Sequence, residues 1–253
     1  KQWFQFVKPN FERYVEPQRK IADIIIPRGV ENKVAITMVT QFIEKKLLEK
    51  SNLHRAKLKI LGQSAGDHSL SENVLILEDT RQLQAMNTIL QDDLTSAEEF
   101  IFYFDRVSTL LVENGLEPVG ETSAVVVLRA GSSFETGLKR VSPDCRTGRI
   151  LIQSNDRNGE PELHYLKLPD DIHTHDTVLI LDPQLSSGGA ALMAVQVLID
   201  HGVAQDRIVF VTYFSGRMGL NRLTHVFPHL HVVVCKITGD IQERWIEKKY
   251  FGC

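Results

Sequence analysis

The sequence predicts an α/β fold in which helices cover both faces of a parallel sheet. Short continuous apolar runs, such as VVVL at 125–128 and VLIL at 178–181, are typical of strands buried on both faces. Segments with the apolar spacing of helices separate these runs, as a parallel sheet requires. The 253 residues are 43% hydrophobic and 24% charged, which supplies enough apolar side chain for a sizeable core.

The beginning of the chain is predicted to hold one strand and one helix. The strand is expected over Asp23–Ile26, where an apolar run is stopped by Pro27. Asn32 can cap the following helix, because its side chain accepts hydrogen bonds from backbone N–H groups two or three residues further on. Apolar residues three and four apart over Val34–Ile43 continue this helix, and we expect it to end in the cation-rich stretch 44–52.

A linker is predicted at residues 61–73, whose sequence LGQSAGDHSLSEN is small and polar. We place the domain boundary near residue 65. The chain is thereby divided into a segment 1–60, the linker and a domain 74–253.

The elements of the domain 74–253 follow from the same patterns. Gly115 indicates the end of a helix over 98–116. The polar loop SNDRNGEP at 154–161 separates two segments with the character of strands. The expected strands are 124–131 with its glycine turn, 149–153, 162–168, 177–182, 207–214 and 231–237, and a short helix is expected over 133–141.

A candidate anion site lies where the strand 177–182 meets the next helix. Asp182 ends the strand, Ser186–Ala190 form a turn of small residues, and the helix that follows stops at Gly202. Ligands of open α/β sheets bind beyond the carboxyl ends of the strands, and the first N–H groups of a helix attract anions. We therefore expect a pyrophosphorylated or phosphorylated sugar here. The alternative is a tight turn whose glycines only permit close packing.

Four motifs of the domain resemble the uracil phosphoribosyltransferase family. VLILDPQLSSGGAA (178–191) is similar to its phosphoribosyl-pyrophosphate (PRPP) loop, and VVVLRAG (125–131) to its pyrophosphate turn. GEPELHYLKLP (159–169) resembles its flexible hood, and KYFG (249–252) its closing motif. The resemblance covers about residues 80–253 in order. It implies a type I phosphoribosyltransferase-like parallel sheet with flanking helices.

The resemblance also implies roles for individual residues. Arg129 would hold pyrophosphate, Asp182 would face the ribose hydroxyls, and the turn after it would cradle the 5′-phosphate. The implied partner is a small molecule, a nucleotide or PRPP. The implied PRPP- or phosphate-binding set is Arg129, Ala130, Gly131, Asp182, Ser186, Ser187, Gly188, Gly189 and Ala190, with Arg157 as a candidate hood contact.

The front of the chain resembles a different family. NFERYVEPQRKIADIIIPRGVENKVAI at 10–36 is similar to the last strand and helix of uridine-cytidine kinases, which have a P-loop kinase domain. Together the two resemblances imply the C-terminal half of a fused uridine kinase, which makes UMP or CMP from nucleoside and ATP. No GxxxxGK[ST] loop occurs in the 253 residues, so ATP and Mg²⁺ are expected in a kinase part upstream of residue 1 and no cofactor in this half.

Several departures from the transferase pattern bear on catalysis. The final segment, ITGDIQERWIEKKYFGC, lacks the Pro-Gly-x-Gly-Asp element that reads uracil in the family, although Asp240 is a candidate substitute. The family's hood arginine aligns with Ser154, and the last position of the phosphate loop is Ala190 instead of Ser or Thr. Gln91 and Asp93 replace cations of a basic family segment.

These departures predict a transferase-like domain that is catalytically defective and regulatory or oligomerising, because base discrimination needs matched buried polar groups. Two alternatives remain open. One is an active uracil phosphoribosyltransferase that makes UMP from uracil and PRPP. The other is a scaffold that binds no ligand.

Other classes of function are disfavoured. Residues 1–59 hold 13 Lys and Arg against 6 Asp and Glu, but the basic stretch 33–59 has only Phe42 as an aromatic, so we expect no nucleic-acid partner. No apolar run of about 18 residues occurs, so we expect no membrane partner. His173 and His175 lack a third metal ligand nearby and are expected in a solvated loop, which leaves no metal site.

Three widely spaced cysteines fit neither a disulfide framework nor a zinc site, which favours a reducing compartment. We expect the cytoplasm, with the nucleus as a second location. A homo-oligomer is expected, and Trp245 is interpreted as a packing or interface aromatic rather than a base-stacking one.

Overall fold

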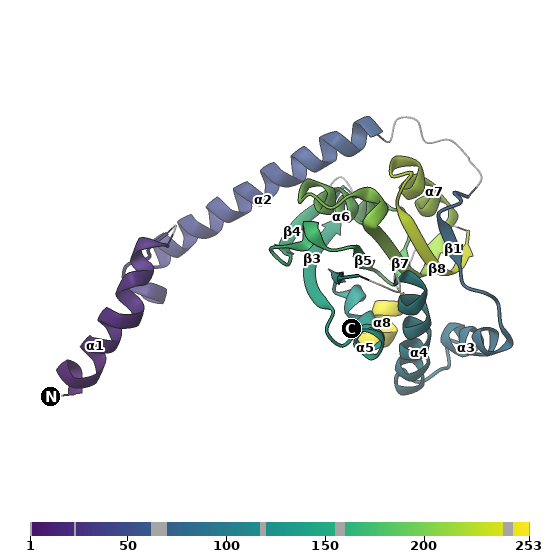
Figure 1. The fold of residues 1–253 in the computed structure, drawn as a ribbon, viewed down its shortest axis with the longest axis horizontal. Coiled ribbons are helices and arrows are strands. Elements are labelled where there is room, and N and C mark those ends of the chain that lie inside the picture. Colours follow the sequence, from purple (N-terminus) through teal and green to yellow (C-terminus); the bar gives the residue numbers. More distant parts are fainter. Residues whose placement is uncertain are drawn as a thin grey trace. The chain divides into compact units, whose positions relative to one another are not determined.

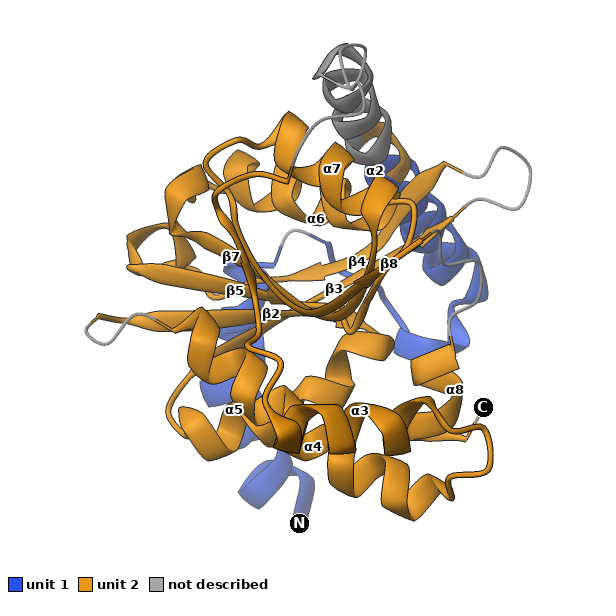
Figure 2. Cartoon of the chain, turned by 90° about the vertical axis from the view of Figure 1, so that its right-hand side faces the viewer, with its two compact units in different colours: residues 1–47 blue, residues 48–253 orange. Residues whose placement is uncertain are grey.

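The computed structural model describes residues 2–22, 24–61, 70–116, 120–154, 160–239 and 245–252. The chain divides into two compact units, Lys1–Leu47 and Leu48–Cys253, which are considered separately (Figure 2). The predicted domain boundary near residue 65 lies outside the described residues and stays a prediction. None of the described helices has both the length and the apolar character needed to cross a membrane.

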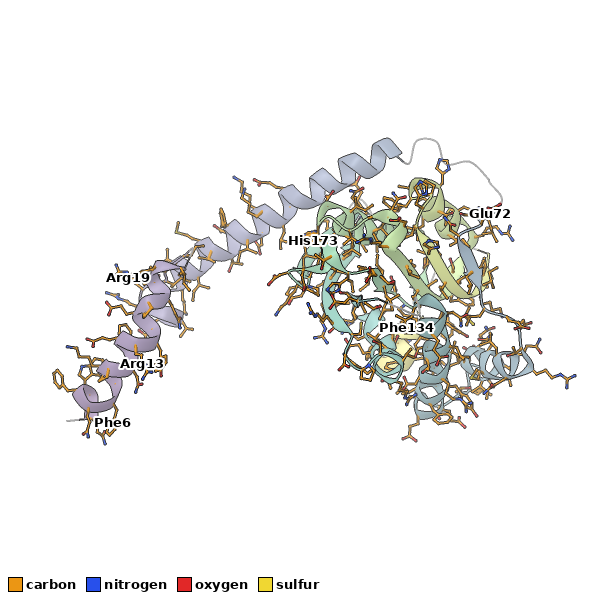
Figure 3. All side chains as sticks on the ribbon, viewed as in Figure 1. Phe6, Arg13, Arg19, Glu72, Phe134 and His173 are labelled. Carbon is orange, nitrogen blue, oxygen red and sulfur yellow. The ribbon has the colours of Figure 1, made fainter. Side chains whose placement is uncertain are left out.

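The first unit is helical throughout its described regular elements (Figure 1). Phe6, Arg13 and Arg19 project from its first helical segments, as Figure 3 shows. The elements are η1 (Trp3–Val7), α1 (Lys8–Asn10), η2 (Phe11–Val15), η3 (Glu16–Lys20), η4 (Gly29–Glu31) and α2 (Lys33–Leu61), the last of which continues into the second unit.

Two expectations for this region are corrected and one is confirmed. Asn32 caps α2, because its Oδ1 accepts a 3.1 Å hydrogen bond from the Ala35 amide. The helix does not end at 44–52; it continues to Leu61, since no Gly or Pro interrupts this stretch. The strand predicted at Asp23–Ile26 is wrong for residues 24–26, and Asp23 lies outside the described residues. A strand needs a neighbouring strand to pair with, and none of the described residues of this unit forms a strand.

The second unit is built on one sheet with the order β1-β8-β7-β5-β2-β3-β4, and β6 pairs with β7 beside this path. All pairs are parallel except β3 with β4, which are antiparallel. The fold class predicted from the sequence is confirmed. The strands are β1 (Val74–Ile76), β2 (Thr122–Leu128), β3 (Arg146–Ser154), β4 (Pro161–Lys167), β5 (Thr177–Leu181), β6 (Gln184–Leu185), β7 (Ile208–Gly216) and β8 (His231–Thr238).

Helices cover both faces of this sheet (Figure 2). The layer on one face contains α6 and α7, and the layer on the other contains α3, α4, α5 and α8. The sequence did not predict α3, α7, α8, β1 or β6. The helices are α3 (Arg81–Gln91), α4 (Ala97–Gly115), α5 (Glu135–Val141), α6 (Gly189–Asp200), α7 (Arg217–Val226) and α8 (Trp245–Phe251).

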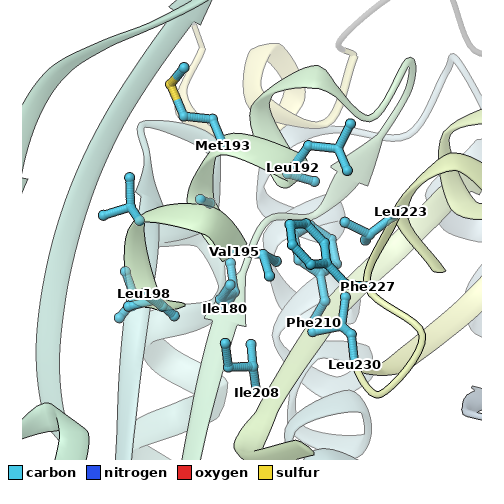
Figure 4. Close-up of a cluster of buried hydrophobic side chains, with 14 of the residues drawn as sticks. Ile180, Leu192, Met193, Val195, Leu198, Ile208, Phe210, Leu223, Phe227 and Leu230 are labelled. Carbon is cyan, nitrogen blue, oxygen red and sulfur yellow. The ribbon is translucent and has the colours of Figure 1, made fainter. Parts of the chain in front are cut away.

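The alternation of side chains along β5 explains why its run is apolar throughout. Ile180 points into the cluster under α6, where Phe210 and Leu198 also lie (Figure 4). Leu179 and Leu181 point into the opposite cluster with α4. Each such fully buried side chain stabilises the fold by about 1.5–3 kcal/mol. The two cores therefore hold the carboxyl ends of β2 and β5 in place.

Candidate functional site

The predicted anion site begins directly beyond β5. Asp182 follows the last strand residue and is buried, at 3% exposed. Its backbone amide donates a 3.2 Å hydrogen bond to the Val211 carbonyl, which ties the loop to β7. Its Oδ1 accepts a 3.4 Å hydrogen bond from the Gln184 amide. The carboxylate is thereby fixed at the carboxyl end of the sheet, as predicted.

The turn Ser186–Ala190 leads from β6 into α6 and has the features of an anion seat. Gly188 is the N-cap of α6, has φ +85°, and contributes no side-chain cap. The first N–H groups of a helix lack intrahelical acceptors, so they face the turn. Ser187 is exposed, and Gly189 and Ala190 are partly exposed. We call Ser186–Ala190 the phosphate seat from here on.

Close packing explains one glycine of the phosphate seat but not the other. A Cβ at Gly188 would lie 3.0 Å from the Gly219 carbonyl oxygen, and the positive φ disfavours a side chain as well. A Cβ at Gly189 would meet only ordinary contacts, the nearest being Pro161 Cδ at 3.7 Å. The packing alternative therefore accounts for Gly188, whereas Gly189 leaves space where a ligand could approach the backbone.

The turn with Arg129 lies beside this loop. β2 ends at Leu128, the Leu128–Arg129 peptide bond is cis, and residues Ala130–Phe134 form the short helix η6. A Cβ at Gly131 would collide with the Leu181 carbonyl oxygen, so glycine is required there. Since β2 and β5 are adjacent parallel strands, the structure brings the Arg129–Gly131 turn next to the Asp182 loop.

Arg129 has a partner that the sequence did not predict. Its Nε lies 3.1 Å from Oε1 of Glu247, which belongs to α8. The Arg129 side chain is 71% exposed and that of Glu247 is 19% exposed. The only sequence signal was the departure of the final segment from the transferase pattern. That departure did not identify Glu247.

Helix α8 is firmly packed on α4 and β7. Ile246 is fully buried, and the Trp245 ring makes edge contacts with Phe100 and Phe214 at centroid distances of 5.8 and 6.1 Å. These contacts confirm Trp245 as a packing aromatic. Tyr250 donates a 2.9 Å hydrogen bond to Asp105 on α4.

The hood is an antiparallel hairpin of β3 and β4, in which Ser154 pairs with Pro161. Pro161 at the start of β4 lies above Gly189 of the phosphate seat. Arg157, predicted as a hood contact, lies outside the described residues, as does Asp240.

Gln91 and Asp93, which replace cations of the family segment, each accept a hydrogen bond from a lysine. Gln91 accepts a 2.9 Å hydrogen bond from Lys236 Nζ. The backbone carbonyl oxygen of Asp93 accepts a 3.0 Å hydrogen bond from Lys249 Nζ on α8. This end of α3 therefore supports α8.

The predicted solvated loop at His173 and His175 is wrong for His175. This side chain is only 1% exposed, and its Nδ1 contacts the Ser123 hydroxyl at the amino end of β2. Its Nε2 lies 3.6 Å from Asp171 and 3.8 Å from Glu121. Burial comes from β2, which is distant in sequence. Among the described residues no group of three or more His, Cys, Asp or Glu is arranged to hold a metal ion.

The structure also contains a cavity that the sequence analysis did not predict. It has a volume of about 490 Å³ and lies between α3 and the carboxyl ends of β1 and β8. Polar groups of Asn87, Gln91 and Lys236 line it together with Cys235, whose pKa burial raises to about 11. Its polar groups bond to one another: Gln91 with Lys236, and Asn87 with Cys235.

A parallel sheet with an acid and an uncapped turn beyond β5, and an arginine turn beyond β2, defines a type I phosphoribosyltransferase-like domain. The uracil phosphoribosyltransferase family model matches residues 117–249, just over half of the chain. The chain belongs to the uracil phosphoribosyltransferase family. Residues 1–35 match the phosphoribulokinase / uridine kinase family model.

Matches to curated relatives cover nearly the whole chain. It is 38% identical to "Uridine-cytidine kinase-like 1" of Mus musculus over 96% of this chain and 48% of the relative. It is 33% identical to the uridine kinase of Saccharomyces cerevisiae, over 100% of this chain and 57% of the relative, and 34% identical to uridine-cytidine kinase A of Dictyostelium discoideum, over 99% and 55%. The chain thus spans about half the length of these relatives.

Among solved structures, the AQ2163 protein from Aquifex aeolicus is similar in fold. Its TM-score is 0.61 with 22% sequence identity, covering 70% of this chain and 97% of that protein. At this identity the likeness shows the fold alone.

Proposed function

We propose that this chain is the C-terminal part of a uridine/cytidine kinase that phosphorylates the nucleoside to UMP or CMP in pyrimidine salvage. The names of the relatives and the kinase-family match at residues 1–35 support this. Those relatives are about twice as long, so the kinase site, with its ATP and Mg²⁺, belongs to the remainder of the protein. The cytoplasm, with the nucleus as a second location, suits a salvage enzyme.

The phosphoribosyltransferase-like domain binds a phosphorylated ribose compound and regulates or assembles the kinase, without transferring a phosphoribosyl group. One observation carries the ligand binding: the phosphate seat is uncapped and partly exposed beside buried Asp182. A helix N-terminus with free N–H groups attracts a phosphate. The final segment lacks the Pro-Gly-x-Gly-Asp element, which argues against uracil recognition.

The test compares the full-length protein with a version that ends before residue 74. Initial rates of uridine phosphorylation, their response to UTP and PRPP, and the mass of the assembly are measured for both. A regulatory or oligomerising domain predicts that at least one of the three changes. Three unchanged results would contradict the proposal.

An active uracil phosphoribosyltransferase is the second candidate, because the family model matches residues 117–249. Incubating the full-length protein with radiolabelled uracil and PRPP distinguishes the two. Formation of labelled UMP at a rate proportional to enzyme would establish the transferase, whereas our proposal predicts none.

A pure scaffold is the remaining alternative. A homo-oligomer that gives no calorimetric heat with PRPP, UTP or UMP would identify it.

A further inference from the structure

The ion pair of Arg129 with Glu247 bears on which phosphorylated ligand the domain accepts. Arg129 follows β2, and the phosphate seat follows β5, the neighbouring strand. A ligand with one phosphoryl group needs only the phosphate seat. A ligand with an additional diphosphate, such as PRPP, needs a second cationic contact, and Arg129 is the arginine that the adjacent turn offers.

Glu247 already supplies that arginine with an anion. Its Oε1 lies 3.1 Å from Arg129 Nε, within hydrogen-bonding distance. The carboxylate is largely shielded, at 19% exposed, whereas the arginine remains 71% exposed. A diphosphate approaching Arg129 would have to displace the carboxylate or remain beside it. Like charges in that position disfavour binding.

The carboxylate cannot easily withdraw, because α8 is fixed on both sides of it. Ile246 is fully buried before it, and Tyr250 is bonded to Asp105 after it. Trp245 packs against Phe100 in the same core. These contacts hold the backbone at Glu247, so the carboxylate stays within reach of Arg129 as long as α8 remains packed. An isolated exposed pair would lack this advantage.

We propose that Glu247 acts as a built-in anion that makes the site selective for 5′-monophosphates over PRPP and pyrophosphate. This rests on the proposed function of the phosphate seat as the place where the 5′-phosphate binds. Removing the charge of Glu247 frees Arg129 for a diphosphate and leaves the phosphate seat as it was.

The experiment measures calorimetric binding of ribose 5-phosphate, PRPP and pyrophosphate to the full-length protein. The variants are Glu247→Gln and the double variant Glu247→Gln with Arg129→Gln. Glu113→Gln is the matched control, because it removes the same charge from an exposed position near the C-terminal end of α4. Thermal unfolding of each variant checks that α8 remains packed.

The wild type is expected to bind PRPP no more tightly than ribose 5-phosphate. Glu247→Gln should strengthen PRPP and pyrophosphate binding by at least about tenfold, as expected when a like charge is removed from a binding site. Its affinity for ribose 5-phosphate should not change. Glu113→Gln should resemble the wild type, and adding Arg129→Gln should abolish the gain.

Contrary outcomes separate this inference from the proposed function. Wild-type protein that binds PRPP at least tenfold more tightly than ribose 5-phosphate overturns the inference and leaves the phosphate seat intact. Equal pyrophosphate affinity in wild type and Glu247→Gln also overturns it. Ribose 5-phosphate that binds no variant, while Glu247→Gln gains pyrophosphate, overturns the phosphate seat and with it the selectivity for 5′-monophosphates, and leaves only the repulsion of a diphosphate by Glu247. No binding of any ligand to any variant overturns both.

Discussion

The Tyr250 hydroxyl donates a 2.9 Å hydrogen bond to Oδ1 of Asp105 and so joins α8 to α4. Asp105 is 8% exposed, and burial raises the pKa of its carboxyl group, an effect that the Tyr250 bond and Arg140 oppose. Burial of Tyr250, together with its bond to Asp105, raises the pKa of the Tyr250 hydroxyl to about 12. This pair holds the helix that carries Glu247.

Replacing Tyr250 with Phe should therefore destabilise the domain. The buried carboxylate of Asp105 loses a donor, and a hydrogen bond to a charged group contributes about 1.5–3 kcal/mol. Urea unfolding at pH 7 measures the change. Tyr165→Phe is the control, because Tyr165 is 44% exposed on β4. Equal losses in the two variants would show that the Tyr250 hydroxyl adds nothing.

Alkaline pH should destabilise the domain through Cys235. Burial raises the pKa of this thiol from 9.0 to about 11, so the folded state favours the neutral form. Its contribution is complete below pH 9 and is lost as the pH rises toward 11, about 2–3 kcal/mol in all. Comparing wild type with Cys235→Ala by urea unfolding from pH 8 to pH 11 isolates this contribution. A pH slope that is the same in both proteins would contradict it.

Gly131→Ala should destabilise the domain strongly, whereas Gly189→Ala should not. The new methyl at 131 would collide with the Leu181 carbonyl oxygen, but at 189 it meets only contacts of 3.7 Å or more. We expect a loss of about 2–4 kcal/mol for Gly131→Ala, as in overpacked sites where the backbone must shift to relieve a clash. Thermal unfolding of both variants gives the comparison, and similar midpoints would refute it.

Gly189→Asp should abolish anion binding and leave the fold intact. A carboxylate at the first residue of α6 interacts favourably with the helix dipole, but it repels a phosphate from the phosphate seat. Calorimetry with ribose 5-phosphate measures binding, and thermal unfolding measures stability. Gly189→Asn is the matched control, because it adds the same bulk without the charge, and it should bind more tightly than Gly189→Asp. Undiminished binding to Gly189→Asp would place the phosphate elsewhere.

Local patterns in the sequence determined the parallel sheet, the candidate phosphate seat and six of the strands, β2, β3, β4, β5, β7 and β8. The runs that form β2, β5, β7 and β8 are apolar on both faces, which can be read from each run by itself. Asn32 caps α2 by bonding to an amide only three residues further along the chain. Such features need only short-range interactions, so the sequence states them directly.

Tertiary structure alone decided which side chains meet across long separations. The pairing of Arg129 with Glu247 and the burial of His175 against Ser123 depend on how strands and helices stack. The failed strand before Pro27 shows the same dependence, because a strand forms only where a partner is available. No local pattern encodes these contacts, since each is fixed by packing between segments that are remote in sequence.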